Sequence, residues 1–186
     1  MEILSEFEKH LLAERGLSLH TLRAYLQDIR QFCDYLEFGP AAFVQKDLKR
    51  KQTEFDLLLR ANRNDVRSFL AHVQTHGDTL RTAARKLASL RAIYRFMERT
   101  GISDVNPAKA VKSPRLKRIL PDALSIPEVT ALLEAPDTSE PLGIRDRAIL
   151  ETLYSSGVRA SELASMHISD VDLVGGTIRI LGKRKK

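Results

Sequence analysis

The chain has 186 residues, 43% of them hydrophobic, and a formal net charge of +6 at pH 7, so it can bury a core and is not a disordered tail. It contains no apolar run long enough to span a membrane, and residues 1–10 lack the apolar segment of a secretory signal peptide. The single cysteine, Cys33, excludes an intramolecular disulfide and a cysteine-based zinc cluster, so we expect a protein of the reducing cytoplasm.

The first two elements are predicted to be amphipathic helices separated by a short break. Apolar residues recur every three or four positions over residues 3–15, and Gly16 occupies a position that commonly ends a helix. Ser18 then has a side chain preferred at a helix N-terminus. The second helix carries its apolar residues at the same spacing, at Leu22, Leu26, Ile29, Cys33 and Leu36.

Residues 38–52 have no regular periodicity and contain a Gly-Pro pair, so we predict a loop or an insertion there. Two further helices are predicted over residues 53–60 and 64–75, the second capped by Asn64 or a residue nearby. The sequence HGDT at residues 76–79 predicts a break before the next helix.

A long helix is predicted from Thr79 to Thr100, with an apolar side and a basic side. The basic side carries Arg81, Arg85 and Arg95, and acidic partners one turn away are nearly absent. Such a helix can pack through its apolar side while its basic side lies in a groove of DNA. The apolar side is formed by Leu87, Leu90, Ile93, Tyr94 and Met97.

Positive charge is concentrated in one part of the chain. Residues 81–121 hold eleven Lys and Arg against Glu98 and Asp104, a net charge of +9, whereas the other 145 residues sum to −3. A basic block in an otherwise near-neutral protein indicates a polyanionic partner, most simply a nucleic acid. The alternative is a solvated helix face followed by a basic linker.

Three prolines, Pro107, Pro114 and Pro121, prevent a long helix after the basic one. Five positive charges lie among them. This composition predicts a stiff, extended linker, and we place the boundary between two domains near residues 113–121.

The part after the linker begins with a helix start, because residues 125–128 read Ser-x-x-Glu, a capping box. One helix is predicted from there to about Glu134, another over residues 143–155 and a short one over residues 159–166. Residues 177–181 alternate as a strand does, after a Gly-Gly turn. Because a strand needs a partner, we expect this domain to be incomplete.

The segment LYSSGVRASEL, residues 153–163, places Arg159 directly after a turn, with Glu162 three residues further on. By itself this spacing is typical of a surface ion pair. The alternative is a phosphate ligand, because a guanidinium stays ionised and binds two oxygen atoms at once. A helix start at this position would add backbone N–H groups near the same phosphate.

Four segments resemble those of the tyrosine recombinases of the lambda-integrase type, and most closely the Xer branch of that family. The resemblance runs along the whole chain. The last of the segments is quite specific, whereas any one of the others alone would be weak, and their order and spacing together argue against a chance match. The segments are LSLHTLRAYLQDIRQFCDYL, RTAARKLASLRAIYRFMERTGISDVNPAKAVKSPRLKRILP, LSIPEVTALLEA and LYSSGVRASELASMHISDVDL.

The resemblance implies a mainly α fold in two parts. Residues 1–112 are expected to form a helical core-binding bundle of the SAM-like type, which grips DNA. Residues 113–121 are the basic, proline-containing linker. Residues 122–186 are the N-terminal, incomplete part of a mixed α/β catalytic domain.

The resemblance also implies DNA strand exchange without a metal or another cofactor. In the family a tyrosine attacks a DNA phosphate, two arginines bind its non-bridging oxygens, and a lysine protonates the leaving 5′-oxygen. Arg159 matches the first of these arginines, with Glu162 placed to hold its guanidinium, and Lys183 matches the lysine. The family has Gly-Lys-Gly where this chain has Arg184 in third place, so a basic tail is the alternative for Lys183.

No segment resembles the second arginine box of the family or its nucleophilic tyrosine. We interpret all the tyrosines of this chain, Tyr25, Tyr35, Tyr94 and Tyr154, as core residues, because they lie on or beside apolar helix faces. These 186 residues are therefore expected to bind DNA without cleaving it.

The expected DNA contacts lie on the second helix, on the long basic helix and in the linker. Phosphate contacts should outnumber base contacts and be sensitive to salt. Plain solvation is the alternative for each side chain, and a metal site at His20 is disfavoured because no second ligand is suitably spaced. The residues are Ser18, His20, Thr21, Arg23, Arg81, Thr82, Arg85, Lys86 and Arg115.

By analogy with the Xer branch, the full-length protein would act as a homo- or hetero-tetramer on two DNA duplexes and resolve chromosome dimers, which links it to cell division. Two other classes stay open. One is a non-catalytic DNA-binding module that competes for a recombination site, and the other is a helical interaction protein with no role on DNA. A salt-dependent mobility shift with DNA separates the last class from the others.

Overall fold

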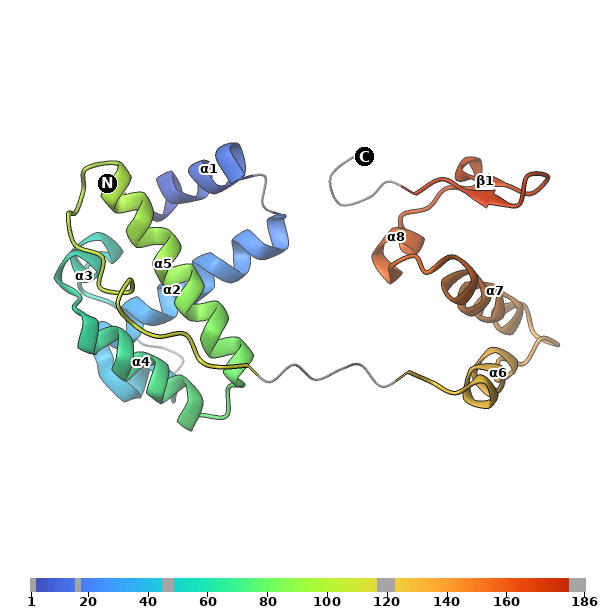
Figure 1. Ribbon diagram of the computed structural model, residues 1–186, viewed down its shortest axis with the longest axis horizontal. Coiled ribbons are helices and arrows are strands. Elements are labelled where there is room, and N and C mark those ends of the chain that lie inside the picture. Colours follow the sequence, from blue (N-terminus) through green and yellow to red (C-terminus); the bar gives the residue numbers. More distant parts are fainter. Residues whose placement is uncertain (1–2, 16–17, 45–48, 117–122, 181–186) are drawn as a thin grey trace. The chain divides into compact units, whose positions relative to one another are not determined.

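The computed structural model describes residues 3–15, 18–44, 49–116 and 123–180, and helices dominate these residues (Figure 1). The chain divides into two compact units, Met1–Arg118 and Ile119–Lys186. The mainly α fold agrees with the sequence prediction: a helical bundle is followed by the helical start of a mixed α/β unit. None of the described helices is long and apolar enough to cross a membrane.

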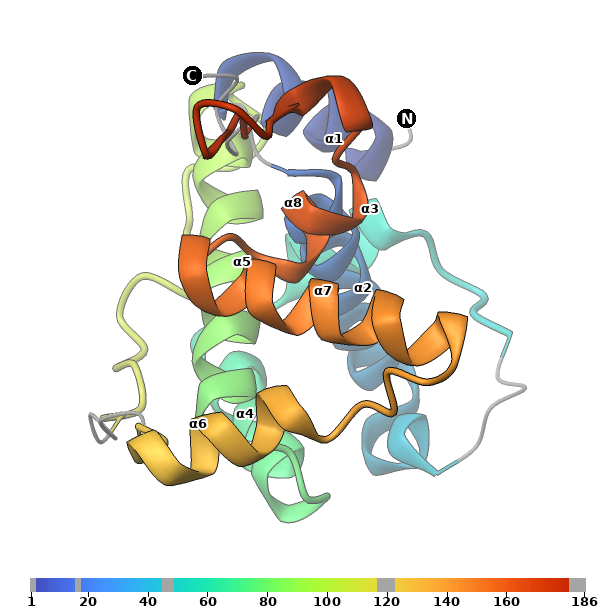
Figure 2. The same cartoon turned by 90° about the vertical axis from the view of Figure 1, so that its right-hand side faces the viewer.

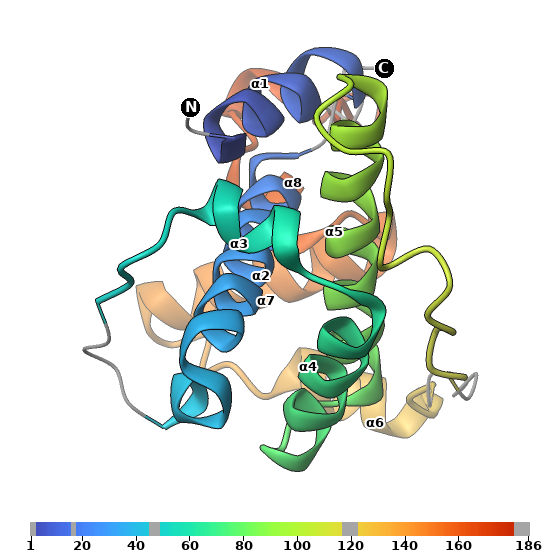
Figure 3. The same ribbon diagram turned by 90° about the vertical axis from the view of Figure 1, so that its left-hand side faces the viewer.

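The first unit is a bundle built around two long helices that pack against each other, α2 and α5. Helix α1 packs on α2 and α3, and α4 packs on both long helices. Figures 1, 2 and 3 show α1 across one end of this pair and α4 near the other. The elements are α1 (Ile3–Arg15), α2 (Leu19–Phe38), the 3₁₀ helix η1 (Gly39–Phe43), α3 (Glu54–Arg60), α4 (Arg63–Thr75) and α5 (Leu80–Arg99).

Side-chain caps fix the starts of these helices. Ser18 caps α2 as predicted, and Thr79 caps α5. Helix α4, predicted to be capped by Asn64 or nearby, is capped by Asn62, whose Oδ1 accepts hydrogen bonds from the N–H groups of Asn64 (2.8 Å) and Asp65 (3.3 Å). Asp65 in turn accepts from the N–H of Asn62 (2.8 Å), and this reciprocal pair, a capping box, favours Asn62 over its neighbour.

The hydrophobic core confirms the predicted apolar faces. Every residue predicted for the apolar side of α5 is buried, and on α2 only Leu36 is partly exposed. Burial raises the pKa of the Cys33 thiol to about 12, so the lone cysteine is an inert core residue rather than a reactive one.

The four tyrosines differ in burial. Tyr94 is buried, and its hydroxyl donates a hydrogen bond to the carbonyl of Leu58 (3.0 Å), which ties α5 to α3. Tyr25 and Tyr35 are partly buried against the core, as predicted. The prediction is wrong for Tyr154, whose side chain is 65% exposed.

The segment after α2 is partly ordered into the bundle rather than being a simple loop. Helix α2 extends to Phe38, and η1 follows it directly. The ring of Phe43, at the end of η1, lies 6.0 Å from that of Tyr35 and 5.0 Å from that of His76. Aromatic packing of η1 against α2 and the end of α4 therefore anchors the first part of the predicted insertion.

The chain beyond α5 stays attached to the bundle through Arg91. Its Nε donates to the carbonyl of Ala108 (3.2 Å), its Nη1 to the hydroxyl of Ser113 (2.9 Å), and its Nη2 to the carbonyl of Val111. Ala108 and Val111 are buried in the core. Three donors of one guanidinium thus fix the first part of the predicted linker region, whereas residues 117–122 lie outside the described residues.

The second unit is a succession of helices followed by a hairpin (Figure 1). Ser125 starts the first helix with the predicted capping box, because its N–H and hydroxyl both donate to Glu128 Oε2 (2.8 and 2.7 Å). The elements are α6 (Ile126–Glu134), α7 (Pro141–Ser156), α8 (Ala160–Ala164), the 3₁₀ helix η2 (Ile168–Asp170), β1 (Val171–Asp172) and β2 (Thr177–Ile178).

Of the predicted strand over residues 177–181, only Thr177–Ile178 forms a strand among the described residues, residue 181 lies outside them, and a partner strand precedes it. Strands β1 and β2 pair antiparallel, with Val171 opposite Ile178 and Asp172 opposite Thr177. Asp172 Oδ1 accepts from the N–H groups of Val174 (3.0 Å) and Gly175 (2.9 Å), which closes the Gly-Gly turn. The partner strand has only two residues, too few for a period-two pattern to reveal it.

No side chain of the described residues 123–180 is buried. Large apolar side chains of this unit instead face solvent, among them Ile126 (82% exposed), Ile168 (96%) and Leu173 (90%). The exposure of Tyr154 has the same cause, because the described part of the second unit contains no core for it to join.

Candidate nucleic-acid interface and catalytic arginine

The N-terminal turn of α2 carries four of the predicted DNA contacts. Ser18 and Thr21 are joined by their hydroxyl groups (2.9 Å), and Ser18 Oγ also accepts from the N–H of Thr21 (3.3 Å). His20 and Arg23 are exposed. The turn thus has two residues that hold its start and two whose side chains reach outward.

Helix α5 begins in the same way. Thr79 and Thr82 are joined by their hydroxyl groups (3.1 Å), and Thr79 Oγ1 accepts from the N–H of Thr82 (3.2 Å). Arg81, between them, is exposed. Both long helices therefore present a capped start with an exposed basic side chain, and such side chains are among the groups that contact phosphates in protein–DNA complexes.

A buried carboxylate connects the two helices. Asp28 of α2 has a side chain only 2% exposed, and it forms ion pairs with two cations of α5. Arg85 Nη1 contacts Asp28 Oδ2, and Lys86 Nζ lies 3.4 Å from Asp28 Oδ1. Arg85 also donates to the carbonyl of Ala24 (3.4 Å), and Lys86 donates to Gln31.

The two cations have different roles in this cluster. The side chain of Arg85 is 41% exposed, so one part of its guanidinium is fixed by Asp28 while the rest is open to a ligand. The side chain of Lys86 is 7% exposed, and Asp28 and Gln31 already bind its ammonium group. The predicted contact between Lys86 and DNA stays a prediction, and its burial favours a supporting position beneath Arg85.

Burial and the two neighbouring cations act on the Asp28 carboxylate in opposite directions. Burial raises the pKa of Asp28 above its ordinary value, although Lys86 and Arg85 act in the opposite direction. A buried ion pair with this balance contributes little to stability and serves chiefly to fix the geometry of its members. In this cluster the ion pair fixes the guanidinium of Arg85, whose side chain is partly exposed.

An open cavity of about 500 Å³ lies over this cluster. Its walls come from α2 and from the start of α5, and both signs of charge are present in them. The residues that line it are Gln27, Asp28, Arg30, Gln31, Asp34, Asp78, Thr82, Arg85 and Lys86. Thr82, Arg85 and Lys86 are thus brought together, whereas Arg115 lines a different cavity with Arg63, Arg67 and Lys112.

The predicted catalytic arginine lies at the junction of α7 and α8. Gly157 ends α7 in the left-handed conformation (φ 64°), and Arg159 then caps α8. The side chain of Arg159 is 73% exposed, and its Nη1 lies 2.6 Å from Glu162 Oε1. The guanidinium therefore has one carboxylate partner and is open to a phosphate on its other side.

Glu162 holds both the backbone and the side chain of Arg159. Its Oε2 accepts from the Arg159 N–H (2.9 Å), and this bond, followed by that to the guanidinium, lowers the pKa of Glu162. Glu162 therefore occupies one of the backbone N–H groups expected near a phosphate at this helix start, that of Arg159. The contribution of the other N–H groups stays a prediction.

Comparison with known proteins assigns the chain to a family. Residues 4–101, just over half of the chain, match the model described as the phage integrase N-terminal SAM-like domain. The chain belongs to the phage integrase family. Residues 123–186 match a second model, described as the phage integrase family.

Relatives within the phage integrase family are named tyrosine recombinases. XerC of Pelobacter propionicus is 43% identical and aligns with 100% of this chain and 57% of its own length. XerC of Myxococcus xanthus is 38% identical over 99% of this chain and 56% of its own length. XerD of Listeria innocua is 34% identical and aligns with 100% of this chain and 58% of its own length. The chain thus spans less than two thirds of the length of these relatives.

Lys183, the second residue predicted for catalysis, lies outside the described residues. The hairpin that leads toward it is described as far as residue 180, and the N–H of Arg179 donates to the carbonyl of Asp170 (2.8 Å). In the part of this phage integrase chain that the structure describes, no group of three or more His, Cys, Asp or Glu is arranged to hold a metal ion.

Two residues that the sequence analysis left unassigned organise the candidate interface. Asp28 could have been noticed, because it is an acidic residue between the buried positions Leu26 and Ile29. Arg91 gives no comparable signal, since its partners are two backbone carbonyls and a hydroxyl brought near by the fold.

Proposed function

We propose that this chain is the DNA-binding and phosphate-clamping part of a Xer-type tyrosine recombinase. The observation that carries the proposal is the match of both parts of the chain to phage integrase models, together with an arginine open to a ligand in each unit. The whole protein would carry out site-specific DNA recombination through a phosphotyrosyl intermediate.

In this proposal the first unit binds double-stranded DNA through the capped starts of its two long helices. Ser18, His20, Thr21 and Arg23 contact the duplex from α2. Arg81, Thr82 and Arg85 contact it from α5, with Lys86 supporting Arg85 and with Arg115 on a phosphate. Arg85 is fixed in advance by Asp28, so less side-chain freedom is lost when it binds a phosphate.

The second unit contributes charge stabilisation to phosphoryl transfer. Arg159 binds the non-bridging oxygens of the scissile phosphate, where negative charge increases in the transition state. Glu162 orients this guanidinium, and Lys183 donates a proton to the leaving 5′-oxygen. The nucleophilic tyrosine is not among the residues that we assign, and the reaction as proposed uses no metal or other cofactor.

At the scale of the whole protein we propose a homo- or hetero-tetramer on two duplexes, which resolves chromosome dimers and so supports chromosome partition at cell division. We propose the cytoplasm as its compartment. These statements rest on the names of the Xer relatives and on the lone, buried cysteine.

The proposal is tested by DNA binding and by covalent capture. The chain should shift a duplex carrying a Xer-type site, with an affinity that falls steeply as salt increases. Arg23→Ala/Arg81→Ala should weaken binding by about tenfold and lower the salt slope by about 2, because two exposed phosphate ligands are lost. The matched variant Lys49→Ala/Lys51→Ala removes two exposed charges elsewhere and should bind normally.

A nicked suicide substrate tests the proposed lack of a nucleophile in these 186 residues. Denaturing gel electrophoresis should show no protein–DNA adduct. A covalent adduct would contradict this part of the proposal, and a failure to shift any duplex at low salt would contradict DNA binding itself.

A further inference from the structure

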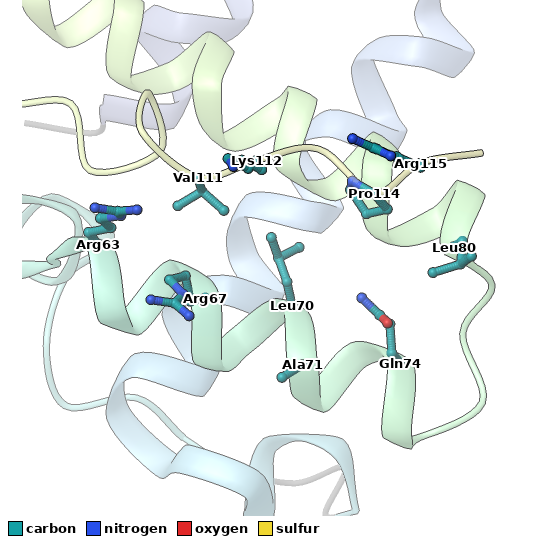
Figure 4. A pocket seen from close by; sticks show the side chains of 10 residues that line it. All are labelled: Arg63, Arg67, Leu70, Ala71, Gln74, Leu80, Val111, Lys112, Pro114 and Arg115. Carbon is teal, nitrogen blue, oxygen red and sulfur yellow. The ribbon is translucent and has the colours of Figure 1, made fainter.

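A basic groove lies on the first unit between α4 and the segment that follows α5 (Figure 4). It is an open cavity of about 540 Å³, which we call the α4 groove. Four of the described residues that line it are positively charged, and no described residue of the lining is acidic. The four are Arg63 and Arg67 of α4 and, from the opposite wall, Lys112 and Arg115.

The charged side chains of the α4 groove, rather than the apolar ones, are available to a ligand. Leu70 of α4 and Val111 of the opposite wall are only 5% and 6% exposed, and both belong to the hydrophobic core. All four cations are exposed. Leu80, which is 49% exposed, lies at the end of the groove where Arg115 lies. A ligand therefore meets chiefly cations and little apolar surface.

The described residues do not neutralise these cations. No hydrogen bond or ion pair of the four side chains is present in the part of the chain that the structure describes. Elsewhere in the first unit arginine is paired, as Arg50 is with Asp34 (3.0 Å) and Glu54 (2.7 Å). The fold thus leaves four positive charges uncompensated along one groove.

The two arginines of α4 stand where a cation is unfavourable for the helix itself. Arg63 is the first residue of α4, and the positive end of the helix dipole disfavours a cation there. Arg67 follows four positions later on the same face, and like charges at this spacing destabilise a helix. Asp65, the acidic residue between them, accepts from the N–H of Asn62. The stability of α4 therefore does not explain the two arginines, whereas an anion in the groove would.

The opposite wall is held in place without a ligand. Arg91 binds the carbonyls of Ala108 and Val111 and the hydroxyl of Ser113, so the backbone is fixed on both sides of Lys112. A wall that is fixed beforehand loses little conformational freedom when the groove is filled.

The α4 groove adjoins the proposed DNA contacts. Arg115, which we assign to a phosphate, lines it, and so does Leu80, which directly precedes Arg81. Figure 4 shows Arg115 and Leu80 toward one end of the groove and Arg63 toward the other. From Arg63 to Gln74 the α4 wall is about 17 Å long at 1.5 Å per residue. This length accommodates several phosphates, because each strand of B-DNA carries one about every 3.4 Å along the helix axis.

We propose that the α4 groove is a further phosphate-binding site, in which Arg63, Arg67 and Lys112 bind the DNA backbone next to the phosphate bound by Arg115. The inference rests on the proposed DNA binding and extends it to α4, a helix that carries none of the contacts assigned above. Regularly spaced anions match a row of unpaired cations and need no apolar pocket. Because contacts with phosphates carry no sequence information, this site should contribute equally to the binding of any duplex.

Arg63→Ala/Arg67→Ala tests the site in the whole chain. Mobility shifts at several salt concentrations would use a duplex with a Xer-type site and a duplex of unrelated sequence. Binding to both should weaken by the same factor, about tenfold, and the slope of log K against log salt should fall by about 2, at about 0.9 per phosphate. Lys112→Ala, from the opposite wall, should lower the slope by about 1 without altering α4.

Matched controls separate the site from net charge and from folding. Lys49→Ala/Lys51→Ala removes two exposed charges outside the groove and should keep the salt slope of the wild type. The urea midpoint of Arg63→Ala/Arg67→Ala should be no lower than that of the wild type, because the two arginines repel each other and have no partner among the described residues. Lost affinity at unchanged stability then reports lost phosphate contacts.

Phosphate ethylation interference locates the contacts on the duplex. Phosphates whose ethylation weakens binding of the wild type but not of Arg63→Ala/Arg67→Ala should adjoin the phosphate that loses its effect in Arg115→Ala. The proposal is overturned if this double variant and Lys49→Ala/Lys51→Ala have the same salt slope, as expected if the groove holds an acidic protein, or if the loss is confined to the Xer-type sequence. A wild-type chain that shifts no duplex would instead refute the proposed DNA binding, and this inference with it.

Discussion

At the scale of single residues, Asp28 decides how the candidate interface is built. It is buried between α2 and α5, and its two oxygens contact Arg85 and Lys86. Because burial raises its pKa despite both cations, the ionised carboxylate opposes folding at neutral pH. A carboxylate that carries such a penalty is better explained by the orientation of Arg85 than by stability.

At pH 7 the free energy of unfolding of Asp28→Asn should therefore equal that of the wild type or exceed it by up to about 1 kcal/mol. A raised pKa in the folded state means that the contribution of Asp28 to stability is complete below the ordinary value of 3.8 and is lost as the pH rises through the folded-state pKa. Urea denaturation at several pH values should show the difference between variant and wild type shrinking toward pH 3.8.

The same variant should bind DNA about fivefold more weakly, because an Arg85 that is no longer fixed loses about 1 kcal/mol of side-chain freedom on binding. Asp104→Asn is the matched control, since it removes one exposed carboxylate outside the interface. Removing negative charge alone favours DNA binding, so the expected loss has the opposite sign. Equal affinities of the two variants in a mobility shift would refute a positioning role.

At the scale of elements, the two long helices share one design. Each begins with a hydroxyl cap followed three residues later by a threonine, and each carries an exposed basic residue in its first two turns. The cap satisfies backbone N–H groups that would otherwise be unpaired. It also fixes where the first turn lies, and hence where Arg23 and Arg81 are presented.

Thr79→Ala should lower the free energy of unfolding by about 1 kcal/mol, because the N–H of Thr82 loses its side-chain acceptor. Thr79→Ser keeps an acceptor oxygen at the same place and should be close to the wild type. Both are measured by urea denaturation of the whole chain. An alanine variant as stable as the serine variant would show that the cap contributes nothing to the start of α5.

At the scale of the whole molecule, the buried core belongs entirely to the first unit, among the described residues. Every buried apolar side chain lies between Ile3 and Val111, whereas no side chain over residues 123–180 is buried. Burial of apolar surface is the main favourable contribution to folding. The stability of the chain should thus come from the bundle that carries the proposed DNA contacts.

A fragment of residues 1–116 should therefore unfold in urea at the same midpoint as the whole chain, with a free energy of unfolding within about 0.5 kcal/mol. Limited proteolysis of the whole chain should first remove residues after 123. A midpoint clearly lower in the fragment would show that the second unit stabilises the first.

The sequence alone determined the apolar faces of α2 and α5, the caps at Ser18 and Ser125, and the family, because these depend on spacing along a single helix or on local motifs. Local patterns also gave the candidate arginine Arg159. They located the cap of α4 only to within two residues, since Asn62 and Asn64 are both suitable until the bond to Asp65 is known.

Only the tertiary structure decided which charged side chains meet. Asp28 contacts Arg85 from 57 positions away, and Arg91 binds the chain 17 to 22 positions later. Such pairs produce no periodic pattern in the sequence, because they arise from the packing of several helices rather than from the geometry of a single helix. The same holds for Tyr154, whose apolar helical position predicted burial that the described part of its unit does not provide.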